Sequence, residues 1–169
     1  SQPMGFYAPA QLVTDARQHN VEVRPVDVSH SQWDCTLEKN EQNTAVLRLG
    51  FRTIVGLSED ITDRIIHVRD QRSYDSFDDF KQRVRLGAAN LSRLSRADAF
   101  RSINLSRRPA LWESLPDQSR HPLFEKLNET DTPATLPRMS EFSQIIADYS
   151  ATGMSLKGHP LQFFRPHFE

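Results

Sequence analysis

Cysteine is nearly absent from this sequence. Its 169 residues include one, Cys35, so no disulfide framework can form and the cysteine clusters of structural zinc sites are missing. The six histidines contain no pair spaced four residues apart, the spacing that places two metal ligands on one helix face. We therefore predict no metal site, and the lone thiol favours a reducing cytoplasm.

Long apolar runs are also missing. No stretch approaches the ~20 apolar residues that span a bilayer, and the opening residues SQPMGFYAPA have neither the charged nor the apolar region of a signal peptide. Apolar residues make up 37% and charged residues 25% of the chain, a composition typical of globular proteins. We expect a cytoplasmic protein that has no membrane partner.

Features of catalytic centres are equally scarce. No serine is flanked by the glycines of a nucleophile elbow. The adjacent carboxylates Asp78 and Asp79 fall in a predicted first helical turn, where acidic residues are common without any metal. We therefore predict no catalytic residue in this chain.

Acidic residues avoid one part of the chain. Residues 81–110 carry eight basic side chains and a single acidic one, Asp98, although the net charge of the whole chain is −1. Such a block indicates a surface that faces a polyanion. A solvated helical face is the alternative interpretation.

Hydrophobic patterning predicts a mainly α fold that includes one small β-hairpin. Apolar spacing predicts a helix over residues 9–19, which Asn20 ends. Alternating residues predict strands over 21–24, 33–38 and 45–49, the last two joined by a polar loop.

The stretch from 47 to 69, LRLGFRTIVGLSEDITDRIIHVR, predicts a helix-hairpin-helix outline. Gly56 permits a tight turn, and Ser58 stands where an N-cap residue is expected. Ile61, Ile65 and Val68 then form one apolar stripe of a helix.

A second copy of this outline follows directly. Ser76 to Asp79 matches a capping box, and it opens a predicted helix that ends near Val84. Gly87 is expected to supply the turn, and Asn90 to cap a helix that continues to Phe100. The two outlines in tandem are more specific than either alone.

Two further helices flank these repeats. Ser106 is expected to cap a helix that packs through Leu111, Trp112 and Leu115. Four prolines recur within residues 116–140, which predicts a linker. An amphipathic helix then begins near Phe142 and ends at Gly153.

Three stretches of the chain resemble the bacterial C-family DNA polymerases, the DnaE-type alpha subunits, in their error-prone branch. They read SQPMGFYAPAQLVTDARQHNVEVRPVDV, RTIVGLSEDITDRI and ADYSATGMSLKGHP. In this order they resemble the end of the fingers domain, the tandem helix-hairpin-helix domain and the segment before the oligonucleotide-binding (OB) fold. The resemblance covers essentially the whole chain.

The resemblance and the patterning together divide the chain into four parts. Residues 1–43 are expected to end the fingers and to form a connecting segment, and residues 44–115 to form the tandem helix-hairpin-helix domain. Residues 116–140 are the proline-rich linker, and residues 141–169 lead toward an OB domain that is missing here.

For the whole protein, the resemblance implies lesion-tolerant DNA synthesis after DNA damage. The polymerising aspartates and their Mg²⁺ would belong to a palm domain outside this chain. We therefore expect no cofactor and no polymerase activity in this fragment. The implied partners are duplex DNA, the remaining polymerase domains and mutagenesis accessory proteins.

The first hairpin is expected to hold a DNA phosphate through its backbone N–H groups. Its predicted DNA-binding residues are Arg48, Arg52, Gly56, Leu57, Ser58 and Arg64. The three arginines would offset the repulsion from Glu59 and Asp60. A structural turn that binds nothing is the alternative.

The second hairpin has fewer glycines and far more positive charge. Its predicted DNA-binding residues are Arg85, Gly87, Ala88, Arg93 and Arg96, and the block continues through Arg101, Arg107 and Arg108. Arginine suits the forked geometry of phosphate, and no helix presents itself to read bases. We expect sequence-independent, salt-sensitive binding in which the first hairpin shapes the module and the second grips DNA.

Two alternatives to DNA binding concern other sequence features. Leu123 and Phe124, with Gln118 upstream, faintly resemble the short motif that docks polymerases on the sliding clamp, although such residues are also ordinary anchors onto a helix. The alternative function is thus a structural or protein-interaction region, docking the clamp or an accessory factor, with hairpins that do not bind. A helix-hairpin-helix glycosylase is disfavoured because no lysine stands at residues 57–60.

Overall fold

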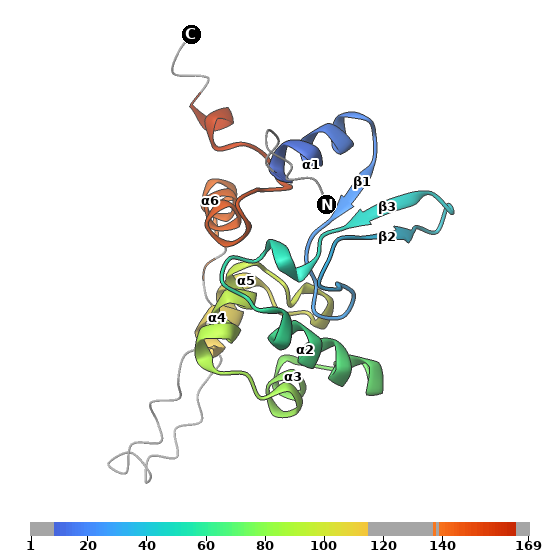
Figure 1. The fold of residues 1–169 in the computed structure, drawn as a ribbon. Coiled ribbons are helices and arrows are strands. Elements are labelled where there is room, and N and C mark those ends of the chain that lie inside the picture. The colour runs from blue at the N-terminus through green and yellow to red at the C-terminus, as the bar shows by residue number, and fades with distance from the viewer. Residues whose placement is uncertain (1–8, 115–136, 138, 165–169) are drawn as a thin grey trace.

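Helices dominate the described residues of the computed structural model, which are 9–114, 137 and 139–164 (Figure 1). The helices are α1 (Pro9–Gln18), α2 (Glu59–Gln71), α3 (Phe77–Val84), α4 (Ala88–Arg96), α5 (Arg107–Glu113) and α6 (Glu141–Thr152). Three 3₁₀ turns accompany them: η1 (Phe51–Thr53), η2 (Arg101–Ile103) and η4 (Pro160–Phe163). The predicted mainly α fold is confirmed.

A three-stranded sheet precedes the helical repeats, with β1 (Glu22–Arg24), β2 (Thr36–Lys39) and β3 (Ala45–Arg48). Strands β2 and β3 pair antiparallel, which confirms the predicted hairpin. Strand β1 adds to it by pairing parallel with β3, so that Glu22 lies opposite Val46. The sheet order is β1-β3-β2, and Figure 1 shows the hairpin projecting to the side of the helices.

Backbone passes very close to backbone where the sheet enters the first hairpin. A Cβ atom on Gly50 would lie 2.3 Å from the carbonyl oxygen of Trp33. Backbone hydrogen bonds hold the two segments together at this point. The N–H of Phe51 donates to Gln32 O at 2.9 Å, and the N–H of Arg52 donates to Trp33 O at 3.0 Å. Only glycine fits at position 50 without moving the chain.

Aromatic rings fill the core between α3 and the end of α4. Phe100 meets Phe77 and Phe80 edge-on, with ring centroids 4.8 and 5.1 Å apart. The buried Tyr74 packs edge-on against Phe80 and donates its hydroxyl to Ile65 O at 2.6 Å. Such edge-to-face contacts add to the apolar burial that holds the repeats together.

The first hairpin has the predicted turn but a shorter leading helix. The segment before it is the single 3₁₀ turn η1, after which Gly56 adopts a φ of 77°. Helix α2 then begins at Glu59, and Ser58 occupies the N-cap position without making a side-chain cap bond. The outline is therefore confirmed, whereas the side-chain cap is absent.

The second hairpin corrects three predictions, the first being the length of its second helix, because α4 ends at Arg96 and not at Phe100. Arg85, not Gly87, takes the left-handed conformation, with a φ of 53°. Gly87 is instead the extended N-cap of α4 (φ −67°), which begins two residues before Asn90. Asn90 thus lies in the first helical turn, where its Oδ1 accepts from Arg93. The capping box predicted at Ser76 is only half formed. The Ser76 hydroxyl accepts from Asp79 N at 3.2 Å, whereas the Asp79 carboxylate accepts from Asp75 N and not from Ser76 N.

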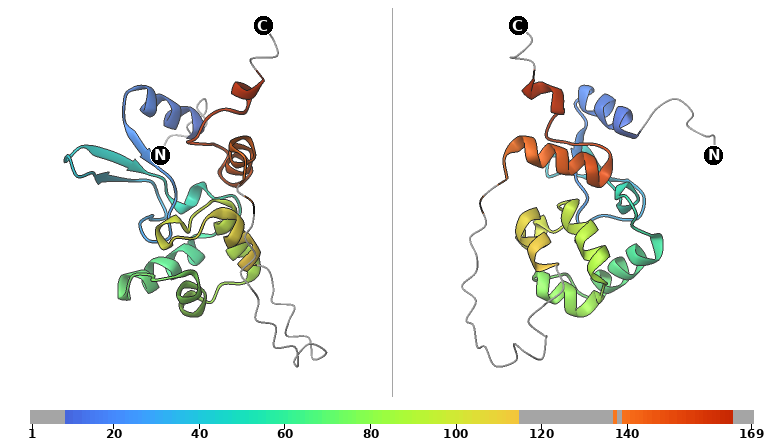
Figure 2. Two further views of the ribbon diagram at one scale, coloured as in Figure 1. Left: turned by 180° about the vertical axis from the view of Figure 1, so that it is seen from behind. Right: turned by 90° about the vertical axis from the view of Figure 1, so that its left-hand side faces the viewer.

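Helix α6 lies across the ends of the repeats and beside α1 (Figure 2). Ser140 caps it, which was not predicted, and Gly153 ends it with a φ of 72°, which was. The prediction for α5 is wrong in two respects. Ser106 occupies the N-cap position but makes no side-chain cap bond, and Trp112 is 62% exposed while the buried face consists of Arg107 and Ala110. A short helix at the edge of the described core buries only one narrow stripe.

Most of the predicted linker, including Gln118, Leu123 and Phe124, lies outside the described residues. The linker and the clamp contact therefore stay predictions. Within the described part of the chain, no helix is long and apolar enough to cross a membrane.

Candidate nucleic-acid interface

The N-terminal end of α4, which is the positive end of the helix dipole, has no side-chain cap. Gly87 offers no side-chain cap, and the first turn contains no acidic residue. The first helical bonds start at Asn90 and Leu91, which both donate to Gly87 O. The N–H groups of Ala88 and Ala89 therefore have no acceptor among the described residues, and both residues are exposed. Unused N–H groups and the helix dipole together favour an anion here.

Two exposed arginines lie at opposite ends of α4. Arg85 stands in the turn just before it and uses only Nε, which donates to Gln82 O at 3.2 Å. Arg96 lies at the other end of the helix, and its guanidinium has no partner among the residues that the structure describes. Both side chains remain able to form forked bonds to phosphate.

The start of α2 in the first hairpin also has unused N–H groups, but its first turn contains acidic residues. The earliest bond of α2 runs from Thr62 N to Ser58 O, so within the described chain the N–H groups of residues 58–61 have no acceptor. Leu57 does not share this property, because it is buried and its N–H donates to Ile54 O at 3.3 Å. Glu59 and Asp60 are exposed in the first turn of α2, and they oppose an anion at this end.

The three arginines predicted to offset these carboxylates have different surroundings. Arg48 is buried in the sheet, where its guanidinium donates twice to Glu38, at 2.9 and 3.0 Å. These bonds lower the pKa of the Glu38 carboxyl. Arg52 is exposed and pairs with Asp34 at 2.9 Å, whereas the exposed Arg64 has no partner among the described residues. Arg48 therefore does not reach the hairpin surface.

The two hairpins touch each other through Gly56 and Arg93. A Cβ atom on Gly56 would lie 3.0 Å from Nε of Arg93 and 3.6 Å from its Cζ. The same guanidinium donates from Nη1 to Asn90 Oδ1 at 2.8 Å. One arginine of the second repeat thus lies directly on the turn of the first.

A family model described as a helix-hairpin-helix motif matches residues 20–110. The chain belongs to the helix-hairpin-helix family. The match includes both hairpins and also the three strands before them, so the sheet is part of the domain that presents the hairpins.

Relatives of this helix-hairpin-helix protein are error-prone DNA polymerases, which confirms the resemblance. The enzyme of Brucella abortus biovar 1 (strain 9-941) is 47% identical over 171 residues, covering 98% of this chain and 16% of that protein. That of Rhodopseudomonas palustris (strain BisB5) is 43% identical over 99% of this chain and 17% of its own length. For Methylococcus capsulatus the identity is 37%, over 100% of this chain and 18% of the relative. The chain thus spans less than a fifth of these relatives.

Several cations of the basic block of the helix-hairpin-helix domain serve its own structure. Arg83 donates to Val68 O and Arg72 O, both at 2.7 Å, and thereby joins α3 to the end of α2. Arg101 pairs with Asp98 at 2.6 Å, and Arg108 donates to Pro137 O at 2.7 Å. The positive charge that stays available is therefore smaller than the count in the sequence.

Arg107 is the clearest case of a structural cation. Its side chain is 5% exposed and pairs with Asp148 of α6, and its Nη1 donates to Gln144 O at 2.9 Å. It joins α5 to α6 and faces no solvent. The prediction that Arg107 belongs to a phosphate-facing block is wrong, because a partner far along the chain buries it.

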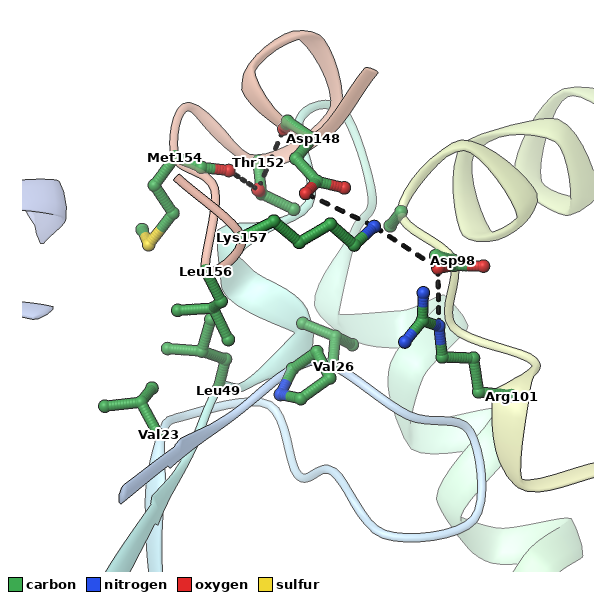
Figure 3. Close-up of a pocket in the computed structure, with 12 residues that line it drawn as sticks. Val23, Val26, Leu49, Asp98, Arg101, Asp148, Thr152, Met154, Leu156 and Lys157 are labelled. Atoms are coloured by element: carbon green, nitrogen blue, oxygen red, sulfur yellow. Dashed lines mark hydrogen bonds and ion pairs between the residues drawn. The ribbon is translucent and has the colours of Figure 1, made fainter. Parts of the chain in front are cut away.

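An ion network that the patterning did not reveal lies beside Arg107. Lys157 Nζ lies 3.6 Å from Asp148 Oδ2 and 3.9 Å from Asp98 Oδ2, and burial lowers the pKa of Lys157. Figure 3 shows Lys157 reaching between the two carboxylates at one end of a cavity of about 180 Å³, with Val23 and Leu49 at the other end. The network ties the C-terminal segment to the helix-hairpin-helix domain.

The Mg²⁺ that the resemblance implies for a whole polymerase finds no fitting ligands in the described residues, which contain no cluster of three or more candidate ligands. The adjacent carboxylates are each bound to cations: Asp78 to Lys81 at 2.9 Å, and Asp79 to Arg72 at 2.6 Å and to Arg83 at 3.0 Å. Carboxylates neutralised in this way are poor ligands for a metal ion.

Proposed function

We propose that this domain binds duplex DNA without regard to sequence, as a module of an error-prone DNA polymerase. The observation that carries the proposal is the start of α4. Its N–H groups are unused within the described chain, its first turn is free of acids, and Arg85 is exposed in the turn just before it. The exposed Arg96 lies at the far end of the same helix. Helix starts of this kind hold phosphate oxygens.

The chemistry of the contacts supports sequence-independent binding. Backbone N–H groups and arginine forks recognise phosphates, which are the same at every base pair. The exposed Arg85 lies in the turn before α4, and the exposed Arg96 lies in the last turn of that helix. Because each neutralised phosphate releases counterions, the affinity falls as salt rises.

The relatives indicate the setting in which this module works. Since they are error-prone DNA polymerases, we propose that the whole protein adds nucleotides on damaged templates, in damage-induced synthesis in the cytoplasm. The polymerising residues and their Mg²⁺ would lie in the part of those proteins that this chain does not cover. The role of the chain is then to hold the duplex beside that centre.

Fluorescence anisotropy of a labelled duplex tests the DNA proposal directly. The wild-type chain should bind, and the slope of log K against log salt should fall by about 0.9 when Arg96→Ala removes one phosphate contact. Arg17→Ala at the end of α1 is the matched control, because it removes the same charge away from both hairpins. Absence of salt-sensitive binding by the wild type, or equal effects of the two substitutions, contradicts the proposal.

An exposed apolar cluster favours a second, complementary role in docking other domains of the polymerase. Phe142 packs edge-on against Phe163 and Phe164 at 5.4 and 6.0 Å, while Ile146 and Leu161 also remain exposed. Contiguous apolar surface of this kind often contacts a partner. Ile146→Ser should weaken association with the remaining domains supplied separately, and unchanged association in sedimentation would dismiss the idea. Docking on the sliding clamp stays a prediction for Leu123 and Phe124, with Phe124→Ala as the test in a clamp pull-down.

A further inference from the structure

The contact between Gly56 and Arg93 joins repeats that are separated by α2 and α3. Gly56 has two reasons to be glycine: its φ of 77° strains any other residue, and a Cβ would lie 3.0 Å from Arg93 Nε. The close approach expected at this glycine is therefore made by a guanidinium of the same chain. The side chain of Arg93 is half-buried, and Asn90 holds one of its ends.

Of the three arginines predicted to offset the acids of the first hairpin, only Arg64 is exposed and without a partner among the described residues. Glu59 and Asp60 are exposed at the start of α2, and like charges a few ångströms away repel a phosphate. Arg48 is committed to Glu38, and Arg52 is paired with Asp34. Arg93 is the cation whose contact with the turn itself is observed.

We propose that Arg93 of the second repeat supplies the positive charge for the phosphate contact of the first hairpin. The inference rests on the DNA binding proposed above and goes beyond it, because it makes one phosphate a joint ligand of both repeats. Apart from the Nη1 bond to Asn90, the donors of this guanidinium have no acceptor among the described residues. Several N–H donors thus remain for a phosphate lying over Gly56.

The arrangement also explains how the first hairpin binds despite its acids. A guanidinium held against the turn restricts its own side chain before DNA arrives, so less entropy is lost on binding. The contact also links a side chain of α4 to the turn before α2. Arg93 is in this sense a positioning residue as well as a phosphate ligand.

Double-mutant cycles in the 169-residue chain test which hairpin Arg93 serves. Proline at the first helical position removes one backbone N–H and fits the helix start, so Glu59→Pro removes a donor from the first hairpin and Ala88→Pro removes one from the second. Glu59→Ala is the matched reference, because it removes the same carboxylate but keeps the N–H. Arg93→Ala is then measured in each background by anisotropy with a labelled duplex of mixed sequence.

The expected result is a loss of affinity on the order of tenfold for Arg93→Ala in the Glu59→Ala background. In the Glu59→Pro background the same substitution should cost at most about threefold, because the shared phosphate is already lost. The cost should stay near tenfold in the Ala88→Pro background. Arg17→Ala should lower the DNA affinity by the same small factor in all three backgrounds.

The inference is wrong if Arg93→Ala lowers the DNA affinity equally in all backgrounds, or if its effect is reduced only in the Ala88→Pro background. Either result leaves the DNA proposal intact. If the wild-type chain binds no duplex, the DNA proposal and this inference are both wrong. Thermal unfolding followed by circular dichroism checks that each variant is folded. Arg93→Gln repeats the cycle with a side chain that keeps an amide donor for Asn90, so a folding defect of Arg93→Ala does not decide the outcome.

Discussion

Replacing Arg107 with methionine separates the structural cations of this domain from those proposed to meet DNA. Methionine keeps a long, flexible side chain at a site that is 5% exposed but removes the charge. The substitution deletes the ion pair with Asp148 and the bond from Nη1 to Gln144 O at 2.9 Å. It thereby loosens α5 from α6 without touching either hairpin.

The size of the effect follows from what remains around Asp148. Removing one partner of a buried ion pair costs about 3–5 kcal/mol, since the other charge stays buried. Asp148 keeps Ser155 Oγ, which donates to it at 2.7 Å, and Lys157 Nζ at 3.6 Å. We therefore expect Arg107→Met to lower the free energy of unfolding by about 3 kcal/mol, at the lower end of that range.

Equilibrium unfolding in urea measures this loss, with Arg108→Met as the matched control. Arg108 is the next residue in α5 but is exposed and makes a single bond, to Pro137 O, so its replacement should cost less than about 1 kcal/mol. Affinity for duplex DNA, measured where Arg107→Met is fully folded, should stay within about twofold of the wild type.

The opposite pattern would refute the reasoning. If Arg107→Met left the free energy of unfolding unchanged and weakened salt-sensitive DNA binding, Arg107 would be a phosphate ligand and not a structural cation. The double variant Arg107→Met with Asp148→Leu offers an internal check. It should be more stable than Arg107→Met alone, because no buried carboxylate that has lost its arginine is left in the interior.

Two further predictions concern the core. Burial raises the pKa of Tyr74 from 10.0 to about 12. The contribution of this tyrosine to the free energy of unfolding is therefore fully present below pH 10 and is lost as the pH rises through about 12. In urea unfolding, Tyr74→Phe should flatten this decline and should cost about 1 kcal/mol near pH 7, because the bond to Ile65 O is lost. Gly50→Ala should prevent native packing, because its Cβ would lie 2.3 Å from Trp33 O. Gly87→Ala should cost no more than about 1 kcal/mol, because a Cβ at this position has no atom within 4 Å. Equal melting temperatures for the two glycine variants would contradict this prediction.

Features that depend on near neighbours in the chain could be predicted from the sequence. The N-cap bond at Ser76 and the left-handed ends at Asn20 and Gly153 are all present. The β2–β3 hairpin and the helical outlines of the repeats are also confirmed. Each depends on interactions within a few residues, so the local pattern is sufficient.

Local reasoning failed where several local solutions compete. At the second hairpin, glycine and asparagine suggested the turn and the cap, but the chain turns at Arg85 and α4 starts at Ala88. Asn90 pairs with Arg93 instead, and Arg93 in turn is held by contact with Gly56. This choice depends on how the two hairpins pack, which neither local pattern contains.

The mainly helical fold, the tandem repeats and the concentration of positive charge in one stretch can all be predicted from the sequence. The role of each charge cannot, because it depends on the partners that the folded chain brings together. Arg107 is neutralised by Asp148, which is 41 residues away in the chain, while Arg96 in the same block stays exposed. The parallel pairing of β1 with β3 likewise joins segments that no local pattern connects. The physical reason is that the energy of a charged side chain depends on its burial and partners in space, whereas helices and turns are set mostly by neighbours along the chain.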